Sequence, residues 1–269
     1  MHPNDPTGPA PTSGSPTTGS ANSDSPTTSD GAGFVAPGTA EAMARLDMPM
    51  AEAMRTQRAV RRLHLEPVSM EVLMPLLELS LKAPTSSNTQ DWSYMVVTDP
   101  EQKARLAKVY RRLFNAFDPI VERMARGDDQ ELRNMRPGQW QAEHFEQLPV
   151  FVIPCYRRNL KHHPVGWPQI SVASFYGSVF PAVQNLLLEC RAVGLGASIQ
   201  TLPLWNVRAA RRILGLPRTM NPVCIIPIGW AKGRYGPTTR RPIGEVVHVD
   251  HYGNQPFLDT APGAATDTH

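Results

Sequence analysis

The residues best suited to chemistry lie in one polar segment, residues 83–92, which reads Ala-Pro-Thr-Ser-Ser-Asn-Thr-Gln-Asp-Trp. Its closely spaced hydroxyls and amides can offer many hydrogen bonds to a planar polar heterocycle, and the indole of Trp92 can anchor the far end of the segment. Pro, Ser and Asn also favour turns for local reasons, so on chemistry alone a polar turn is the first interpretation.

Arginines gather in short groups near both ends of the region that can fold. The first group comprises Arg55, Arg58, Arg61 and Arg62, and the second comprises Arg240 and Arg241. Guanidinium groups bind phosphate through charge-assisted, often bidentate hydrogen bonds, so one small anion would account for both groups. Each arginine taken singly can equally be a solvated surface charge. The formal net charge is only +3, and no single basic stripe indicates nucleic-acid binding.

The histidines and cysteines do not form a recognisable catalytic or metal-binding pattern. Histidines occur without HExxH spacing, and Cys155, Cys190 and Cys224 are far apart in apolar surroundings. We therefore predict no metal site and expect buried, reduced thiols. His162 and His163 fall in a predicted loop, where a surface pair is a simpler interpretation than a substrate contact.

Helical and strand patterns mix along the chain without strict βαβ alternation, which favours an α+β fold. Apolar spacing and caps predict helices near residues 43–54, 69–83, 101–117, 174–193 and 207–214. Strands are predicted near residues 94–97, 150–153, 197–199, 223–228 and 246–249. The helix at 174–193 has a broad apolar face and should be central and deeply packed.

Composition separates a folded region from its flanks. Residues 1–33 contain almost no apolar side chains, so we predict a disordered tail over 1–38, a single domain over 39–257 and a flexible C-terminal tail over 258–269. The start of the chain lacks the pattern of a secretory signal. The longest apolar cluster, residues 148–156, is far shorter than the roughly 20 residues of a membrane-spanning helix. We expect a soluble, cytoplasmic protein.

Four segments, in order, resemble motifs of the nitroreductase family. Residues 83–92 resemble Ala-Pro-Ser-Ser-x-Asn-x-Gln-Pro-Trp, with Thr85 at a small-hydroxyl position and Asp91 at the Pro position. Residues 57–63 resemble Arg-Arg-Ser-Val-Arg-x-Phe, and residues 194–198 resemble the Gly-Leu-Gly turn that follows the central helix. Residues 240–247 resemble the closing basic-Pro-x-x-Glu-Val-Val segment. Together the four blocks cover Met54 to about Asp250.

The resemblance implies a nitroreductase-like fold with a central mixed or antiparallel sheet, flanking helices and a long buried central helix. It also implies non-covalently bound FMN. The phosphate would be held by the segment Arg58, Ala59, Arg61 and Arg62 together with Arg240 and Arg241. The isoalloxazine ring would be lined by Pro84, Thr85, Ser86 and Asn88. Backbone groups of Ile199, Gln200 and Thr201 would approach its N5 edge.

Two departures from the family pattern concern the phosphate. Gln57 stands where many members have an arginine, and Ala59 replaces a serine hydroxyl. Both changes remove phosphate contacts, so flavin affinity should be lower than usual unless Arg240 and Arg241 compensate.

The family further implies a domain-swapped homodimer with the flavin between subunits. Residues 246–257 would form an arm over the partner, although an edge strand packed on its own subunit is the alternative. Hydride would pass from NADH or NADPH through the flavin to a nitroaromatic, a quinone or a related electron-poor acceptor in a ping-pong cycle, with no catalytic side chain required. Residues 115–147 are the natural lid, in which Phe114, Phe117 and Trp140 could stack on substrate or simply pack. A flavin-storing protein, or a family member that catalyses reductive dehalogenation or flavin cleavage, remains an alternative.

Overall fold

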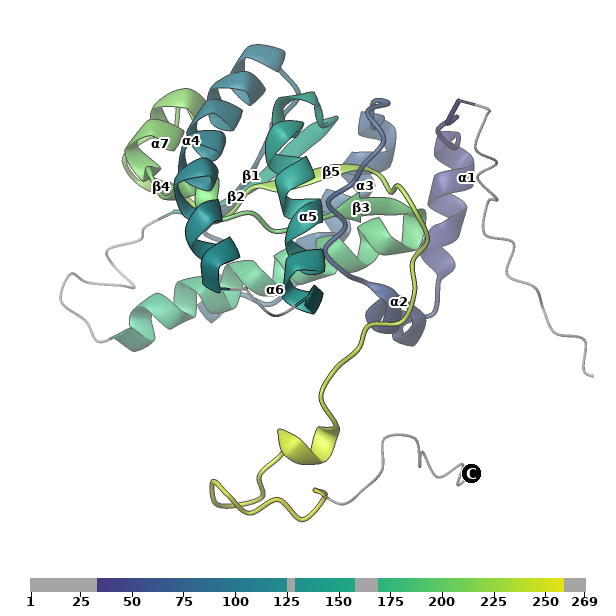
Figure 1. The fold of residues 1–269 in the computed structure, drawn as a ribbon, viewed down its shortest axis with the longest axis vertical. Helices are drawn as coiled ribbons and strands as arrows, with labels where there is room; N and C mark the ends of the chain where they lie inside the picture. The colour runs from purple at the N-terminus through teal and green to yellow at the C-terminus, as the bar shows by residue number, and fades with distance from the viewer. Residues whose placement is uncertain (1–32, 125–128, 158–168, 259–269) are drawn as a thin grey trace, which may run out of the picture. The chain divides into compact units, whose positions relative to one another are not determined.

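The computed structural model describes residues 33–124, 129–157 and 169–258 (Figure 1). The chain comprises two units, residues 1–35 and 36–269, and every helix and strand given below belongs to the second. Most of the predicted tails lies outside the described residues, as do His162 and His163, so those boundaries stay predictions. None of the described helices combines the length and apolar character needed to cross a membrane.

The described chain forms seven α-helices joined by short 3-10 turns (Figure 1). The helices are α1 (Thr39–Ala44), α2 (Met50–Thr56), α3 (Met70–Ser80), α4 (Pro100–Met124), α5 (Asp129–Glu143), α6 (Gln169–Val193) and α7 (Val207–Leu214). The 3-10 turns are η1 (Arg45–Asp47), η2 (Ser86–Asn88), η3 (Phe145–Gln147), η4 (Leu202–Leu204) and η5 (Ile243–Glu245). Ser69 caps α3 by accepting a hydrogen bond from the N–H of Glu71, as its sequence position predicts.

Five strands form one antiparallel sheet, which confirms the α+β fold. They are β1 (Trp92–Val97), β2 (Val150–Arg157), β3 (Leu195–Ala197), β4 (Met220–Pro222) and β5 (Ile226–Trp230). The order is β1-β2-β5-β3, with β4 also paired to β2. The strand predicted at 223–228 corresponds to β5, which begins at Ile226, while β4 just before it was not predicted; the two pair with different parts of β2.

The prediction of a strand at residues 246–249 was wrong. Those residues follow the turn η5 and lead into further tight turns, and no described strand pairs with them. Its backbone hydrogen bonds instead close on themselves, as when the Val249 N–H donates to the Asn254 carbonyl. A strand needs a neighbouring strand to form a hydrogen-bonded ladder, and none of the described residues forms such a neighbour beside residues 246–249.

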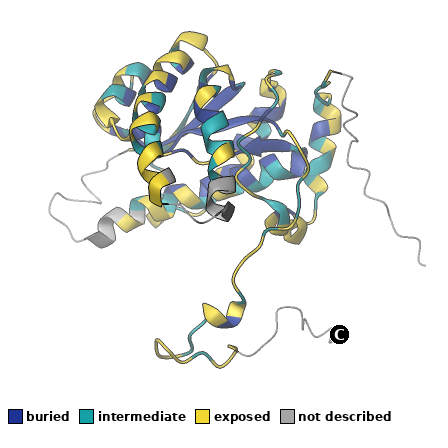
Figure 2. Cartoon of the chain, in the orientation of Figure 1, coloured by how far each residue is buried: buried dark blue, intermediate teal, exposed yellow. Residues whose placement is uncertain are grey.

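Helix α6 packs on β2 and β3 and supports α3, which makes it the central helix predicted from its apolar face. Its Val179, Val183, Leu186, Leu187 and Cys190 are all buried. Helix α4 contributes Leu106, Ala107 and Tyr110 to a cluster that includes Phe151 and Ile153 of β2. Figure 2 shows burial concentrated in the sheet and in the helix faces turned to it. All three cysteines are free and buried, as predicted.

The basic segment is fixed along the edge of the sheet by backbone contacts. The Val60 N–H donates to the Ala197 carbonyl at 3.0 Å, and Leu63 forms a bridge with Ala231. This close approach requires a glycine at position 196, because a Cβ there would lie 2.5 Å from Leu63 Cδ2 and 2.8 Å from Val60 Cγ1. Residues 60–63 therefore depend on Gly196 for their position.

Substituting Gly196→Ala should destabilise the protein by about 1–3 kcal/mol, because the added methyl group overpacks a buried contact. Gly138→Ala in α5 is the matched control, since a Cβ there would meet nothing within 4 Å. Alanine should stabilise that helix by about 0.5–1 kcal/mol. Urea denaturation followed by circular dichroism measures both effects, and equal effects of the two substitutions would contradict the packing argument.

One oxygen of a half-buried carboxyl group on α6 lacks a hydrogen-bond partner among the described residues. That atom, Glu189 Oε2, is itself shielded from solvent. Burial raises the pKa of Glu189 to about 8, so the folded protein keeps this carboxyl protonated at neutral pH.

Glu189 should make stability fall as pH rises. The unfolded carboxyl titrates near pH 4.3, so between roughly 4.3 and 8 the folded state holds a proton that the unfolded state has lost. The stability that depends on this carboxyl is fully present below the window and is lost as the pH rises toward 8 and beyond. We expect Glu189→Gln to raise the thermal midpoint at pH 8.5 but not at pH 4. The exposed Glu78→Gln serves as control, and parallel pH profiles for wild type and Glu189→Gln would refute this role.

Candidate functional site

The two groups of arginines converge within one chain. The N–H and hydroxyl of Thr238 both donate to the Arg55 carbonyl, at 2.9 and 3.2 Å, and Arg58 Nη2 donates to the Pro237 carbonyl at 3.5 Å. Arg240 and Arg241 follow Thr238 after one further residue, Thr239. Backbone segments that are some 180 residues apart in sequence thus lie side by side, and each carries arginines of one of the two groups.

These arginines carry charge that the described chain does not neutralise. Five of them make no ion pair with any carboxylate among the described residues. These five are Arg58, Arg61, Arg62, Arg240 and Arg241. All are exposed except Arg61, which is half-buried. Burial raises the pKa of Tyr110 to about 12, and the positive charge of Arg61 opposes that rise. Concentrated, unpaired guanidinium charge is suited to binding an anion.

The turn that follows β3 lies beside the basic segment. Its side chains alternate between buried and exposed. Ser198 and Gln200 are buried, whereas Ile199 and Thr201 are exposed. The N–H and C=O of Gln200 both pair with Ile225 at 2.8 Å, so the Gln200 backbone is occupied within the chain. Successive peptide groups of an extended chain point to opposite edges. The N–H groups of Ile199 and Thr201 therefore point away from Ile225, toward the open edge.

The loop at residues 84–90 holds an unusual backbone conformation. Ser87, Asn88 and Gln90 have φ angles of 49°, 50° and 49°, a region that residues other than glycine rarely adopt. Hydrogen bonds hold the loop: Ser178 Oγ of α6 accepts from the Ser86 N–H at 3.1 Å, and Asn88 Oδ1 accepts from Gln90 Nε2 at 3.1 Å. Strain concentrated in one polar loop is typical of functional sites.

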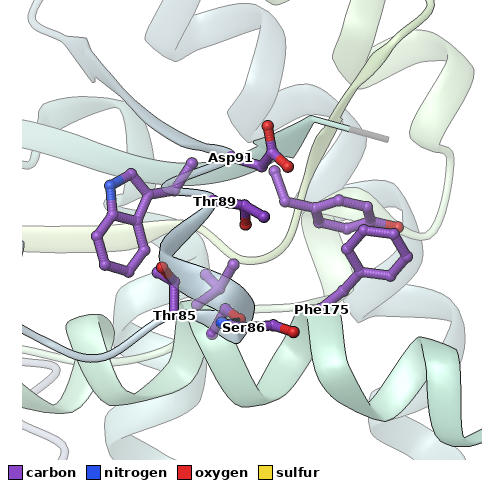
Figure 3. Close-up of a pocket in the computed structure, with 9 residues that line it drawn as sticks. Thr85, Ser86, Thr89, Asp91 and Phe175 are labelled. Carbon is purple, nitrogen blue, oxygen red and sulfur yellow. Dashed lines mark hydrogen bonds between the residues drawn. The ribbon is translucent and has the colours of Figure 1, made fainter. Parts of the chain in front are cut away.

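A small cavity lies between this loop, the end of β2 and α6 (Figure 3). Thr85 and Ser86 line it from the loop, with the Asp91 side chain opposite. The rings of Tyr156 and Phe175 stack at its wall with centroids 4.8 Å apart. Sequence reasoning missed these two aromatic residues. Only the strand register, which sets Tyr156 opposite Trp92, identifies one of them as a neighbour of the loop.

The loop lies against the middle of α6, and the basic segment lies near the C-terminal end of that helix. The loop is bound to α6 at Ser178, whereas Thr56, next to the basic segment, accepts a 2.7 Å hydrogen bond from Arg191 Nε. Ser178 and Arg191 are thirteen residues apart on the same helix, which corresponds to about 20 Å along its axis. The polar loop and the basic segment are therefore separate in the single chain.

The aromatic residues of the expected lid have packing partners in this chain. Phe114 and Trp140 pack against the hydrophobic core, and the rings of Phe117 and Trp205 are 4.8 Å apart. The segment itself forms the end of α4 and all of α5. Among the described residues, no three histidine, cysteine or acidic side chains gather in a way that could hold a metal ion.

Comparison with known proteins gives a consistent family relationship. The model described as "Nitroreductase family" matches residues 54–230. Iodotyrosine deiodinase of Nematostella vectensis is 24% identical over 217 residues, 78% of this chain and 78% of that protein. Iodotyrosine deiodinase 1 of Rattus norvegicus is 26% identical over 198 residues, and there the match spans 71% of this chain but only 65% of the rat protein.

Solved structures share the fold at low sequence identity. Oxidized iodotyrosine deiodinase bound to FMN and 3-iodo-L-tyrosine matches with a TM-score of 0.57 at 22% identity, over 76% of this chain and 99% of that one. Nitroreductase A from Vibrio parahaemolyticus matches with a TM-score of 0.57 at 21% identity, over 76% of this chain and 75% of that one. Because the family model matches most of the folded region, the chain belongs to the nitroreductase family.

Proposed function

We propose that this protein is an FMN-dependent oxidoreductase that transfers hydride from NADH or NADPH to an electron-poor acceptor such as a nitroaromatic or a quinone. The observation that carries the proposal is the convergence of the Arg58 and Arg241 segments beside the open backbone edge at Ile199 and Thr201. This region offers a cationic pole and a row of neutral hydrogen-bond donors, which suits a phosphate joined to a polar ring.

The donor set fits the phosphate of FMN. Arg58, Arg61 and Arg241 are the principal ligands in this proposal, with Arg62, Arg240 and the backbone at Ala59 completing the segment. Their charge has no described carboxylate to satisfy it. Phosphate accepts paired hydrogen bonds from the planar guanidinium fork. The second group of arginines thereby compensates for the contacts that Gln57 and Ala59 lack.

The ring would lie between the open edge of one chain and the polar loop of another. The outward N–H groups of Ile199 and Thr201 would face N5, while Gln200 anchors the turn from inside. Pro84, Thr85, Ser86 and Asn88 would contact the ring through side chains and backbone. Bound FMN would supply the hydride chemistry, and the chain's residues would bind it, orient it and exclude water.

We infer a homodimer from the separation of the polar loop and the basic segment. Since the loop and the arginines lie about 20 Å apart along α6, a twofold partner would bring its loop to the arginines of the first chain. Exposed apolar side chains on α2, α3 and α6 supply a surface that such a partner would cover; they are Met50, Met54, Met74, Tyr176 and Phe180.

The segment at residues 246–257 would be the arm that grips the partner. Tyr252 is 94% exposed and Phe257 is also exposed in the single chain. Gln255 Nε2 donates to the Gly244 carbonyl at 3.0 Å, so the arm is held as a compact hook by its own contacts. Burial of these apolar side chains on a second copy would favour association.

Reductive dehalogenation is a second candidate, because iodotyrosine deiodinases are among the relatives in both sequence and structure. The two reactions are distinguishable by their acceptors. NADH- or NADPH-dependent reduction of a nitrofuran supports the first candidate. Iodide release from 3-iodo-L-tyrosine with dithionite as reductant, without nitrofuran turnover, supports the second.

Purified protein should bind added FMN and acquire a flavin absorption spectrum. Arg58→Ala and Arg241→Ala should each weaken FMN affinity about 10- to 100-fold, the equivalent of a lost charge-assisted hydrogen bond. Arg218→Ala, an exposed arginine beyond α7, is the matched control and should bind normally. Fluorescence titration of FMN measures all four proteins. No flavin binding by the wild type would defeat the cofactor assignment.

Mixed dimers should show that one site draws on two chains. One chain would carry Arg58→Ala with Arg241→Ala, and the differently tagged partner would carry Asn88→Leu. The heterodimer then contains one intact site, formed by the arginines of the second chain and the loop of the first. We expect tight binding of one FMN per heterodimer and weak binding by both homodimers. Weak binding at both sites of the heterodimer would show that each site is built within one chain.

A further inference from the structure

A buried group of polar side chains lies directly beneath the turn at residues 198–201. Gln141 of α5 is 0% exposed, Ser198 1% and Gln200 9%. Gln141 Nε2 donates to Ser198 Oγ at 3.0 Å, and Gln200 Nε2 donates to Gln141 Oε1 at 2.5 Å. Tyr110 of α4, also buried, donates to Gln200 Oε1 at 3.4 Å. The network thus links two helices to the turn.

Such a network is sensitive to geometry, because a buried amide that loses its partner is left desolvated and unpaired. Ser198 and Gln200 reach it together because side chains two residues apart on an extended chain share one face. Their partner Gln141 is the residue that bonds to both. Gln200 Nε2 also donates to Ser198 Oγ at 3.3 Å. An apolar residue at position 141 would therefore remove the bonds to α5 and leave these two side chains bonded only to each other and to Tyr110.

The same residues set the direction of the outward backbone groups. With the Ser198 and Gln200 side chains held inward and the Gln200 peptide groups paired to Ile225, the N–H groups of Ile199 and Thr201 face the open edge.

We propose that Gln141 is a positioning residue, which holds the N–H groups of Ile199 and Thr201 in hydrogen-bonding geometry toward N5 of bound flavin through its bonds to Ser198 and Gln200. The inference rests on the proposed FMN site. N5 of oxidised flavin is an unprotonated acceptor, whereas N5 of the two-electron reduced form carries a proton. Donors aimed at N5 therefore favour the oxidised form and lower the reduction potential.

The test compares FMN affinity and midpoint potential in wild type, Gln141→Leu and Ser198→Ala. Loss of aligned donors should weaken binding of oxidised FMN more than binding of reduced FMN. A tenfold difference between the two corresponds to a rise of about 30 mV in the two-electron potential. Gln139→Leu is the control, since Gln139 lies two residues away on α5 and bonds to Asp118 instead; its potential should match the wild type.

The two network substitutions should also be coupled. If Gln141 acts through Ser198, the double variant should shift the potential by less than the sum of the single shifts. A purely structural role would lower the thermal midpoint of Gln141→Leu while leaving the potential and the flavin absorption bands unchanged, and that result would overturn the inference.

Two further outcomes are separable. Failure of the wild type to bind FMN would reject the proposed function itself, whereas FMN binding with an unchanged potential in the variants would reject only the role of Gln141. Should Gln141→Leu fail to fold, Ser198→Ala decides the question, because it removes one hydroxyl with little change in volume. An unchanged potential in that variant would also overturn the inference.

Discussion

The close approach of residues 60–63 to β3 is the contact on which the candidate site depends. Because Gly196 has no side chain, Val60 and Leu63 can pack directly on the strand, and the Val60 N–H reaches the Ala197 carbonyl. That register sets the first group of arginines beside the turn that begins at Ser198. Residues 236–238 then run back across the same segment through Thr238 and bring the second group to it.

Helix α6 organises the rest of the site by keeping its parts separate. The polar loop is bound near the middle of the helix, at Ser178, and the basic segment lies near its C-terminal end, at Arg191. In the proposed dimer, a symmetric partner would supply the half of the site that each chain lacks. The arrangement would couple cofactor binding to assembly, because the ligand would contact both chains and would stabilise the pair by mass action.

Local patterns in the sequence predicted most of the helices and strands, whereas the site residues that the motifs indicate stay predictions. The Ser69 cap, the apolar face of α6 and the buried β2 depend on residues near one another in the chain, so they could be predicted. The network of Gln141, Ser198 and Gln200 could not, because its members are brought together only by tertiary packing. Tyr156 was missed for the same reason. Residues 246–249 have strand-like composition, but composition does not supply a pairing partner.

The backbone of the polar loop has a consequence for recognition. Ser87, Asn88 and Gln90 are held at positive φ by contacts to α6 and within the loop. A flexible loop would have to lose its freedom at the moment of binding, which weakens association. Here that ordering is completed during folding, where the packing of α6 can offset it. The loop can therefore act as a rigid wall whose shape, more than its adaptability, selects what enters.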